Sequence, residues 1–208
     1  SVWGDGEAFF NAMKYHMSRM QTNTVLTAMN QLSNHDHSRF LTRTNQVVGR
    51  TGTLGPEKAS ENVKLPVFRE AVVIQMTWPG APTIYYGDEA GVCGFTDPDN
   101  RRTYPWGHEN HKLIAFHKDI IRIHKESEAL RYGSLEILLG EENLLAYGRF
   151  TETEKVIIII HNRSELSEVT VPVWRAEVPM KCKMQSNIYS YEHGYKMDSE
   201  QYLVEDGE

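Results

Sequence analysis

Cysteine is scarce in this sequence of 208 residues. Its two cysteines, Cys93 and Cys182, lie far apart and form no C-x-x-C pair, which argues against a disulfide framework and a zinc knuckle. Their scarcity agrees with a reducing, cytoplasmic compartment. No N-terminal stretch has the pattern of a signal peptide, although the chain starts at Ser1 without an initiator methionine. We therefore expect a cytoplasmic protein, and a sequence that is a piece of a longer chain.

Long apolar runs and clusters of basic residues are also missing. The longest apolar run, 156–160, has the length of a strand, far short of the roughly 20 residues that span a bilayer. The formal net charge is -6, without any block of Lys or Arg, so the electrostatic footprint of a nucleic-acid-binding protein is absent. We expect neither a membrane span nor a nucleic-acid partner.

Motifs of several enzyme classes are missing as well. The sequence has no G-x-S-x-G, no G-x-G-x-x-G, no P-loop and no H-E-x-x-H. The pairs His35-x-His37 and His108-x-x-His111 have the spacing of metal ligands, but a zinc site needs three or four ligands with further support. We expect no metal and no cofactor, and a metal-dependent hydrolase built on these histidines stays open as an alternative.

Residues 1–132 alternate between helical and strand-like patterns. Asp5 is a plausible N-cap for the first helix, and Pro66 suits the first position of the second. The predicted helices cover 6–20, 66–78 and 111–127, and the predicted strands cover 25–32 and 81–87. This order predicts parallel strands joined by helical crossovers, as in a doubly wound sheet or a (β/α) barrel.

Residues 133–208 show the shorter period of β-strands. The predicted strands cover 135–139, 143–150, 155–161, 168–174, 186–191 and 201–205. They predict a small antiparallel β domain, and we place the domain boundary between Tyr132 and Gly133. The fold class predicted for the whole chain is therefore α/β plus all-β.

Polar side chains gather where the two strands of the α/β part end. The first cluster covers 34–39, and the second covers 85–89 and is followed by a long loop. In parallel α/β folds the carboxyl ends of the strands form the active face. Aromatic rings, carboxylates, histidine and arginine together suit a polyhydroxylated sugar. A turn with Asx hydrogen bonds and an Asp–Arg pair is the alternative for the first cluster.

Two motifs carry a resemblance to a known family. LSNHDHSRFL (32–41) and GAPTIYYGDEAGV (80–92) resemble the last two strand ends of the alpha-amylase family, glycoside hydrolase family 13. The loop DPDNRRTYPW (97–106) is similar to the neopullulanase, cyclomaltodextrinase and alpha-glucosidase branch. The resemblance implies the C-terminal part of a (β/α)8 TIM barrel in 1–132, followed by an antiparallel β-sandwich in 133–208.

The same resemblance implies roles for individual residues. Asp36 becomes the carboxylate that stabilises the oxocarbenium-like transition state, and His35 a donor to the same sugar ring. Asp97 and Arg101 become ligands of sugar units further along the chain. Arg39 either binds substrate or orients Asp36. The motif that contains Asp88 and Glu89 is mainly structural in this family.

One departure from the family decides what the chain can do alone. Retaining glycosidases need a nucleophile and a general acid about 5–5.5 Å apart, and the family motifs that supply them do not occur before residue 31. We expect a part of a glycosidase acting on maltooligosaccharides, cyclodextrins or pullulan. We expect it to be inactive alone and to form a homo-oligomer or to associate through open barrel edges. A non-catalytic carbohydrate-binding accessory protein is the alternative.

Overall fold

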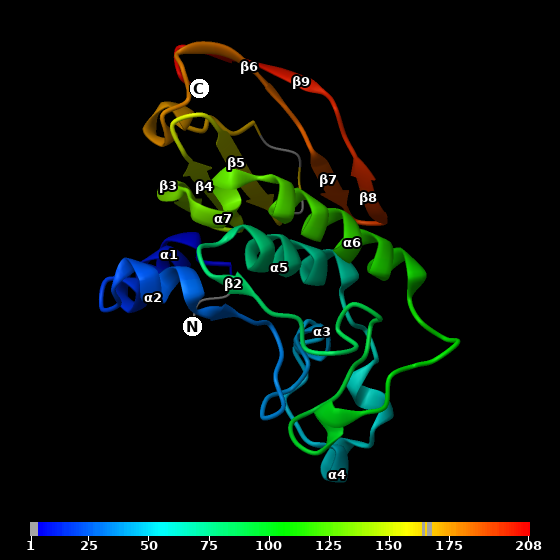
Figure 1. Ribbon diagram of the computed structural model, residues 1–208. Helices are drawn as coiled ribbons and strands as arrows, with labels where there is room; N and C mark the ends of the chain where they lie inside the picture. The colour runs from blue at the N-terminus through cyan, green and yellow to red at the C-terminus, as the bar shows by residue number, and fades with distance from the viewer. Residues whose placement is uncertain (1–3, 164, 166–167) are drawn as a thin grey trace.

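The computed structural model of the chain describes residues 4–163, 165 and 168–208. Helices α5 and α6 form a central layer, with loops and short helices on one side and most strands on the other (Figure 1). The helices are α1 (Gly6–Met17), α2 (Thr22–Thr27), α3 (Phe40–Arg43), α4 (Thr51–Leu54), α5 (Leu65–Thr77), α6 (His111–Glu126) and α7 (Glu128–Tyr132). Short 3-10 helices are η1 (Glu57–Ala59), η2 (Asp99–Arg101) and η3 (Val173–Ala176). The strands are β1 (Met29–Asn30), β2 (Ala81–Pro82), β3 (Ser134–Glu141), β4 (Leu144–Phe150), β5 (Lys155–His161), β6 (Lys181–Gln185), β7 (Ile188–Tyr191), β8 (Gly194–Met197) and β9 (Gln201–Glu205).

The three predicted long helices are present, and side-chain caps explain where two of them begin. Asp5 caps α1, its Oδ1 accepting a hydrogen bond from the Ala8 N–H at 2.8 Å. Asn110 caps α6 in the same way, accepting from the Leu113 N–H at 3.0 Å.

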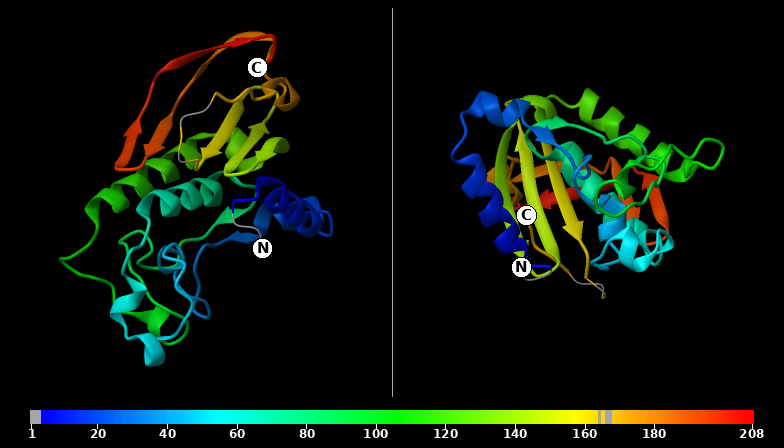
Figure 2. Two further views of the ribbon diagram at one scale, coloured as in Figure 1. Left: turned by 180° about the vertical axis from the view of Figure 1, so that it is seen from behind. Right: turned by 90° about the horizontal axis from the view of Figure 1, so that it is seen from below.

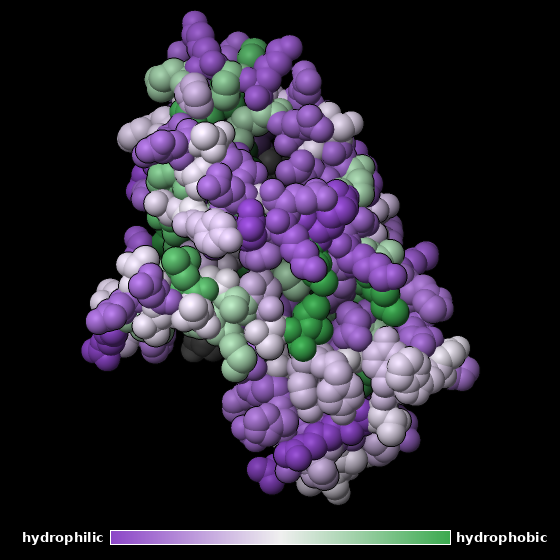
Figure 3. All heavy atoms as spheres, viewed as in Figure 1, coloured by the Kyte–Doolittle hydropathy of each residue, from purple (hydrophilic) through white to green (hydrophobic). Residues whose placement is uncertain are grey.

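The exposed face of α6 is mostly hydrophilic (Figure 3). Among the described residues, no helix is long and apolar enough to cross a membrane.

Strands β1 and β2 form a parallel pair with α5 as the crossover between them. The Thr83 N–H donates to the Asn30 carbonyl at 2.9 Å, which extends this short ladder. The parallel α/β unit is therefore present, but the predicted strands over 25–32 and 81–87 are wrong in length. A short apolar run has the same pattern in a strand and in a helix. The first three residues of the predicted strand 25–32 accordingly lie in α2.

Core side chains fix α5 against α6 and the loop that follows β2. Phe68 and Val72 of α5 are fully buried and pack in one cluster with Phe116 and Ile120 of α6 and with Phe95 of the loop. Burial of each such side chain contributes roughly 1.5–3 kcal/mol. This cluster gives the loop after β2 a rigid base.

In the described residues the β part contains one three-stranded antiparallel sheet and two two-stranded antiparallel pairs. Strands β3, β4 and β5 pair in that order, while β6 pairs with β9 and β7 with β8. Leu138 and Ala146 of the sheet share a buried cluster with Val204 of β9. An antiparallel β part therefore follows the α/β part, as the sequence predicts. The complete sandwich stays a prediction.

The prediction of a strand over 168–174 is wrong. Pro172 has no N–H for a ladder, and the chain turns into η3 after it. Val171 and Val173 still fill the core beneath the sheet. The alternating apolar pattern therefore correctly indicates buried residues, although these residues pair with no strand. Helix α7, which Ser127 caps by accepting from the Leu130 N–H at 3.1 Å, and strands β6 and β8 were not predicted.

Aromatic side chains join the α/β part to the sheet. Trp78 lies 5.2 Å from Tyr147 and 6.2 Å from Phe10, measured between ring centroids. The hydroxyl of Tyr147 also meets the Thr77 hydroxyl at 2.5 Å. These rings bring together α1, the end of α5 and β4, and α1 lies along the sheet in Figure 2. This aromatic junction crosses the predicted boundary at 132/133, which stays a prediction.

Arg149 reinforces the same junction from β4. Its side chain is fully buried, and its guanidinium donates to the carbonyls of Thr77 at 2.7 Å and Gly133 at 2.9 Å. Burial lowers the pKa of Arg149 to about 10. The contacts tie the ends of α5 and α7 to the sheet, where carbonyl groups at helix ends carry partial negative charge.

Candidate active site

The first site loop, residues 33–39, follows β1 and is shaped by one asparagine. Asn34 Oδ1 accepts hydrogen bonds from the N–H groups of Asp36 at 2.9 Å and His37 at 3.0 Å. This is the Asx turn considered as the alternative from sequence, and it leaves its acidic residue open to solvent. The side chains of His35 and Asp36 are both 66% exposed, with 3.4 Å between Nε2 and Oδ1. The loop thus offers a carboxylate and an imidazole side by side.

Arg39 ends this loop with a fully buried side chain. Its Nε donates to the Asn100 carbonyl at 2.9 Å, and its Nη1 donates to Asp88 Oδ1 at 2.9 Å and to the Tyr86 carbonyl at 2.5 Å. The guanidinium carbon lies 4.1 Å from the ring centroid of Tyr85 and 4.8 Å from that of Tyr86. The carboxylate that Arg39 bonds is that of Asp88, and the two roles predicted for Arg39, contact with substrate and orientation of Asp36, stay predictions.

Asp88 is the carboxylate partner of Arg39. It is buried, and burial raises its pKa above the ordinary value, while hydrogen bonds from Ser33 and Arg39 oppose that rise. The Asp88 oxygen that bonds the buried guanidinium of Arg39 is not accessible to solvent or substrate. The structural role expected for this motif therefore agrees with the geometry.

The second site loop, residues 94–102, carries the other predicted ligands. Asp97 Oδ1 lies 2.6 Å from Arg101 Nε, and both side chains are half-exposed. Asp99 is held from inside the loop, because Arg102 donates to both of its carboxylate oxygens at 3.0 and 2.9 Å. The Asp99–Arg102 ion pair therefore stabilises the turn from inside, and the Asp97–Arg101 ion pair lies at its surface, where a ligand can reach it.

Asn100 joins the two site loops. It is fully buried, and its Nδ2 donates to the carbonyls of Asn34 at 3.2 Å and His37 at 2.9 Å. The Arg39 N–H adds a main-chain bond to the Gly94 carbonyl at 2.9 Å. The loop with the exposed acid and imidazole and the loop with the exposed ion pair therefore form one continuous edge.

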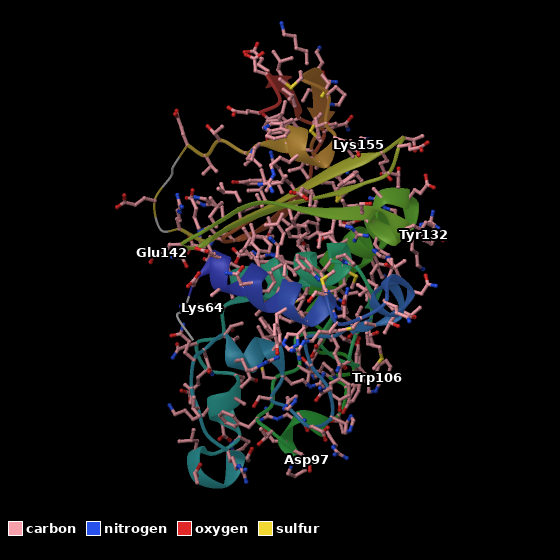
Figure 4. The ribbon with its side chains drawn as sticks, turned by 90° about the vertical axis from the view of Figure 1, so that its left-hand side faces the viewer. Lys64, Asp97, Trp106, Tyr132, Glu142 and Lys155 are labelled. Carbon is pink, nitrogen blue, oxygen red and sulfur yellow. The ribbon has the colours of Figure 1, made fainter. Side chains whose placement is uncertain are left out.

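This edge lies at one end of the molecule. Figure 4 shows Asp97 remote from Glu142 and Lys155, which mark the sheet. The second site loop continues into a segment where Trp106 is 79% exposed and its ring lies 4.6 Å from that of Tyr104. Aromatic faces and charged hydrogen-bonding groups are thus presented by the same stretch of chain.

A hollow of about 450 Å³ opens beside the site loops. Its walls include Leu41, Ser60, Cys93, His108 and Asn110. Burial raises the pKa of the Cys93 thiol, and a protonated thiol is a poor nucleophile. Across the described part of the chain, no group of three or more His, Cys, Asp or Glu side chains is placed to hold a metal ion. The exposed carboxylate and imidazole of the first site loop and the exposed ion pair of the second therefore suit hydrogen bonding to a ligand with many hydroxyl groups.

Comparison with known proteins decides the family. The sequence profile described as "Alpha amylase, catalytic domain" matches residues 4–128, more than half of the chain. This chain belongs to the alpha-amylase family. The amylopullulanase of Thermoanaerobacter thermohydrosulfuricus is 35% identical over 157 residues, which cover 70% of the chain and 10% of that protein. The cyclomaltodextrinase of Thermoanaerobacter pseudethanolicus is 35% identical over 159 residues, which cover 75% of the chain and 25% of that protein.

A solved structure gives the same assignment. The debranching enzyme from Nostoc punctiforme superposes with a TM-score of 0.60 at 27% identity, covering 74% of the chain and 28% of the enzyme. The chain thus spans a quarter or less of the two curated relatives. Family membership, predicted from the motifs at 32–41 and 80–92, is confirmed. The roles of individual residues stay predictions.

Several residues that build this candidate site were not predicted from sequence. Asn100 joins the two loops, and Asp99 with Arg102 builds the second turn. The available signal was turn chemistry, since asparagine and aspartate in D-P-D-N bond to nearby main chain. That signal identifies a turn, but it does not reveal which distant carbonyl an amide will reach.

Proposed function

We propose that this chain is the C-terminal part of a retaining hydrolase of α-1,4- or α-1,6-linked glucans. The observation that carries the proposal is the buried tie from Asn100 to the first site loop, because it holds Asp36 and the Asp97–Arg101 pair on one edge. In this proposal residues 1–132 are the end of a catalytic TIM barrel and 133–208 are a β-sandwich domain. The parallel pair β1–β2 with its helical crossover supports the barrel part.

Each exposed polar group has a role in this proposal. The Asp36 carboxylate stabilises the positive charge that develops on the sugar ring in the transition state, because a fixed charge aimed at a developing charge lowers the barrier. His35, 3.4 Å from Asp36, hydrogen-bonds a hydroxyl of the same ring. Asp97 and Arg101 bind hydroxyls of a sugar further along the glucan, with the open pair offering both an acceptor and a donor.

The nucleophile and the general acid belong to other parts of a longer protein in this proposal. Retaining cleavage needs two carboxyl groups about 5–5.5 Å apart, one of them protonated. Asp88 is unsuited to either task because its carboxylate bonds Arg39 inside the protein. We therefore propose that the chain alone hydrolyses no glucan. Maltooligosaccharides, cyclodextrins and pullulan are the proposed substrates, and the names of the relatives, amylopullulanase and cyclomaltodextrinase, support this choice.

Reconstitution tests the proposal. The purified chain is assayed on maltooligosaccharides, β-cyclodextrin and pullulan, alone and mixed with the separately expressed upstream part of its gene product. We expect turnover only in the mixture, and none when the mixture contains Asp36→Asn. Gel filtration of the chain alone should show association, since a two-stranded parallel sheet leaves open edges. Hydrolysis by the isolated chain at the rate of the mixture would contradict the proposal.

A further inference from the structure

The hairpin β7–β8 carries two exposed tyrosines on one face. Tyr189 is 52% exposed and Tyr191 is 44% exposed. Alternate residues of a strand point to the same side, and the two rings are nearly parallel, with 21° between their planes and 6.2 Å between their centroids. Two large aromatic faces therefore stand next to each other at the surface.

The opposite strand leaves each of these rings about half exposed. Tyr191 pairs with Gly194, and the Tyr191 hydroxyl lies 3.3 Å from where a Cβ on Gly194 would be. The ring therefore leans across a position that has no side chain. Tyr189 pairs with Lys196, whose Nζ lies 5.6 Å from the ring centroid and 3.8 Å from an oxygen of Asp198. The half-exposed Lys196 thus places a charged donor at the rim of the rings, and Asp198, whose side chain is only 11% exposed, holds that donor in position.

The other face of the hairpin is fixed to the helices. Arg69 of α5, itself buried, donates to Ser190 Oγ at 3.0 Å and to the carbonyls of Tyr191 at 2.5 Å and Glu192 at 3.2 Å. The Tyr195 hydroxyl donates to Asp119 Oδ2 of α6 at 2.8 Å. These contacts hold the hairpin from below, so the exposed rings are placed before any ligand arrives, which reduces the entropy cost of binding.

We propose that Tyr189 and Tyr191 form a second, non-catalytic binding site for an α-glucan chain. The choice of ligand rests on the proposed function. A pyranose has an apolar face that stacks on an aromatic ring, and hydroxyls at its edge that can accept a hydrogen bond from a donor such as Lys196. The glucan is neutral, which fits a rim with one cation beside one anion. Helices α5 and α6 separate the hairpin from the site loops (Figure 1), so a glucan held here leaves the candidate active site free.

Binding measurements on the 208-residue chain test this site. Sedimentation with insoluble starch and titration with maltoheptaose are compared for the wild type and the double variant Tyr189→Ser/Tyr191→Ser. We expect a loss of affinity of about tenfold or more, and near-normal binding by Tyr189→Phe/Tyr191→Phe because the rings remain. The matched control is Tyr132→Ser, which removes another exposed tyrosine, on α7, and should bind starch as the wild type does.

The outcomes separate this inference from the proposed function. Circular dichroism and thermal unfolding first establish that the variants are folded. Unchanged starch binding by the serine double variant overturns the second site, as does a wild-type chain that binds no starch. If the serine double variant instead alters the association state of the chain without sugar, the face joins copies of the chain, and the inference is overturned. Hydrolysis by the reconstituted mixture judges the proposed function in each case.

Discussion

The side-chain amide of Asn100 donates a hydrogen bond to the main-chain carbonyl of His37, across 2.9 Å and 63 positions of sequence. The same amide reaches the Asn34 carbonyl at 3.2 Å. The first site loop is therefore positioned by a residue of the second, and the orientation of Asp36 depends on a contact outside its own motif.

Replacing Asn100 with alanine should destabilise the protein. The partly buried carbonyls of Asn34 and His37 lose their donor, and an unsatisfied buried polar group costs about 1–3 kcal/mol. Urea unfolding followed by circular dichroism should show a loss of about 2 kcal/mol or more. Asn45→Ala is the control, because Asn45 also donates to two carbonyls, at 3.1 Å each, but at an exposed site. Equal losses in the two variants would contradict a special role for the buried tie.

Arg39→Met should leave Asp88 buried without its partner, at a cost of about 3–5 kcal/mol near neutral pH. Burial already raises the pKa of Asp88 in the folded state above its unfolded value. A raised pKa means that the group favours folding at low pH and that this stability is lost as pH rises through the folded-state pKa. The free energy of unfolding of Arg39→Met should therefore recover as the pH falls from neutral through the raised folded-state pKa of Asp88.

The double variant Arg39→Met/Asp88→Asn is the control for that prediction. It removes both charges, so the extra dependence on pH should disappear. A single variant whose stability changes with pH in parallel with the double variant would show that Asp88 is not the group responsible.

Asp36→Asn should act on turnover. A carboxylate that meets positive charge mainly in the transition state changes kcat more than KM, and loss of such a group lowers kcat by about 10²–10³-fold or more. Steady-state assays of the reconstituted mixture measure both constants. Because the Asp36 side chain is 66% exposed, the variant should unfold at the wild-type temperature. Wild-type kcat in the variant would remove Asp36 from the proposed site.

Arg101→Ala should depend on the length of the substrate. The half-exposed Asp97–Arg101 pair is proposed to hold a distant sugar, so KM should rise for longer maltooligosaccharides and stay unchanged for short ones. Arg102→Ala is the comparison, because Arg102 braces Asp99 inside the turn and its loss should weaken activity on all lengths alike. The same uniform loss in Arg101→Ala would argue for a structural role.

Glu70→Gln should flatten the dependence of stability on pH. Glu70 lines a largely apolar groove with Val67, Ile74 and Leu145, and burial raises its pKa from 4.5 to about 7, against the opposing charge of Arg69. The folded state therefore favours the protonated acid, and stability from this group is lost as pH rises between about 4.5 and about 7. Thermal unfolding across this range should lose part of its slope in Glu70→Gln but keep it in Glu61→Gln, an exposed glutamate.

The sequence predicted the elements whose cause is local. Asp5 and a repeat of apolar residues define α1, and a similar repeat defines α6. The strands of the sheet β3–β4–β5 were also predicted, since alternating apolar residues and turns mark antiparallel strands. These elements follow from neighbours in the sequence.

Features that depend on distant partners were not predictable in the same way. Whether Val25 lies in a strand or in α2 depends on the ladder partners that the fold supplies. The alternating apolar residues around Val171 reflect burial in the core, because η3 and the residues before it fill the core without pairing as a strand. In the site, the polar residues of the first loop were found from sequence, but the buried course of Arg39 and the reach of Asn100 follow from tertiary packing.

The aromatic junction has a consequence for modular exchange within the family. Trp78 and Tyr147 come from opposite sides of the predicted boundary, yet they occupy one packed interior with Phe10. A chimera that joins the helices of this chain to the β part of a relative must supply a ring of the same shape beside Trp78, with a hydroxyl within reach of Thr77. Whether the α/β part and the β part of two relatives are compatible therefore depends more on the packing of Tyr147 than on the length of the connecting segment.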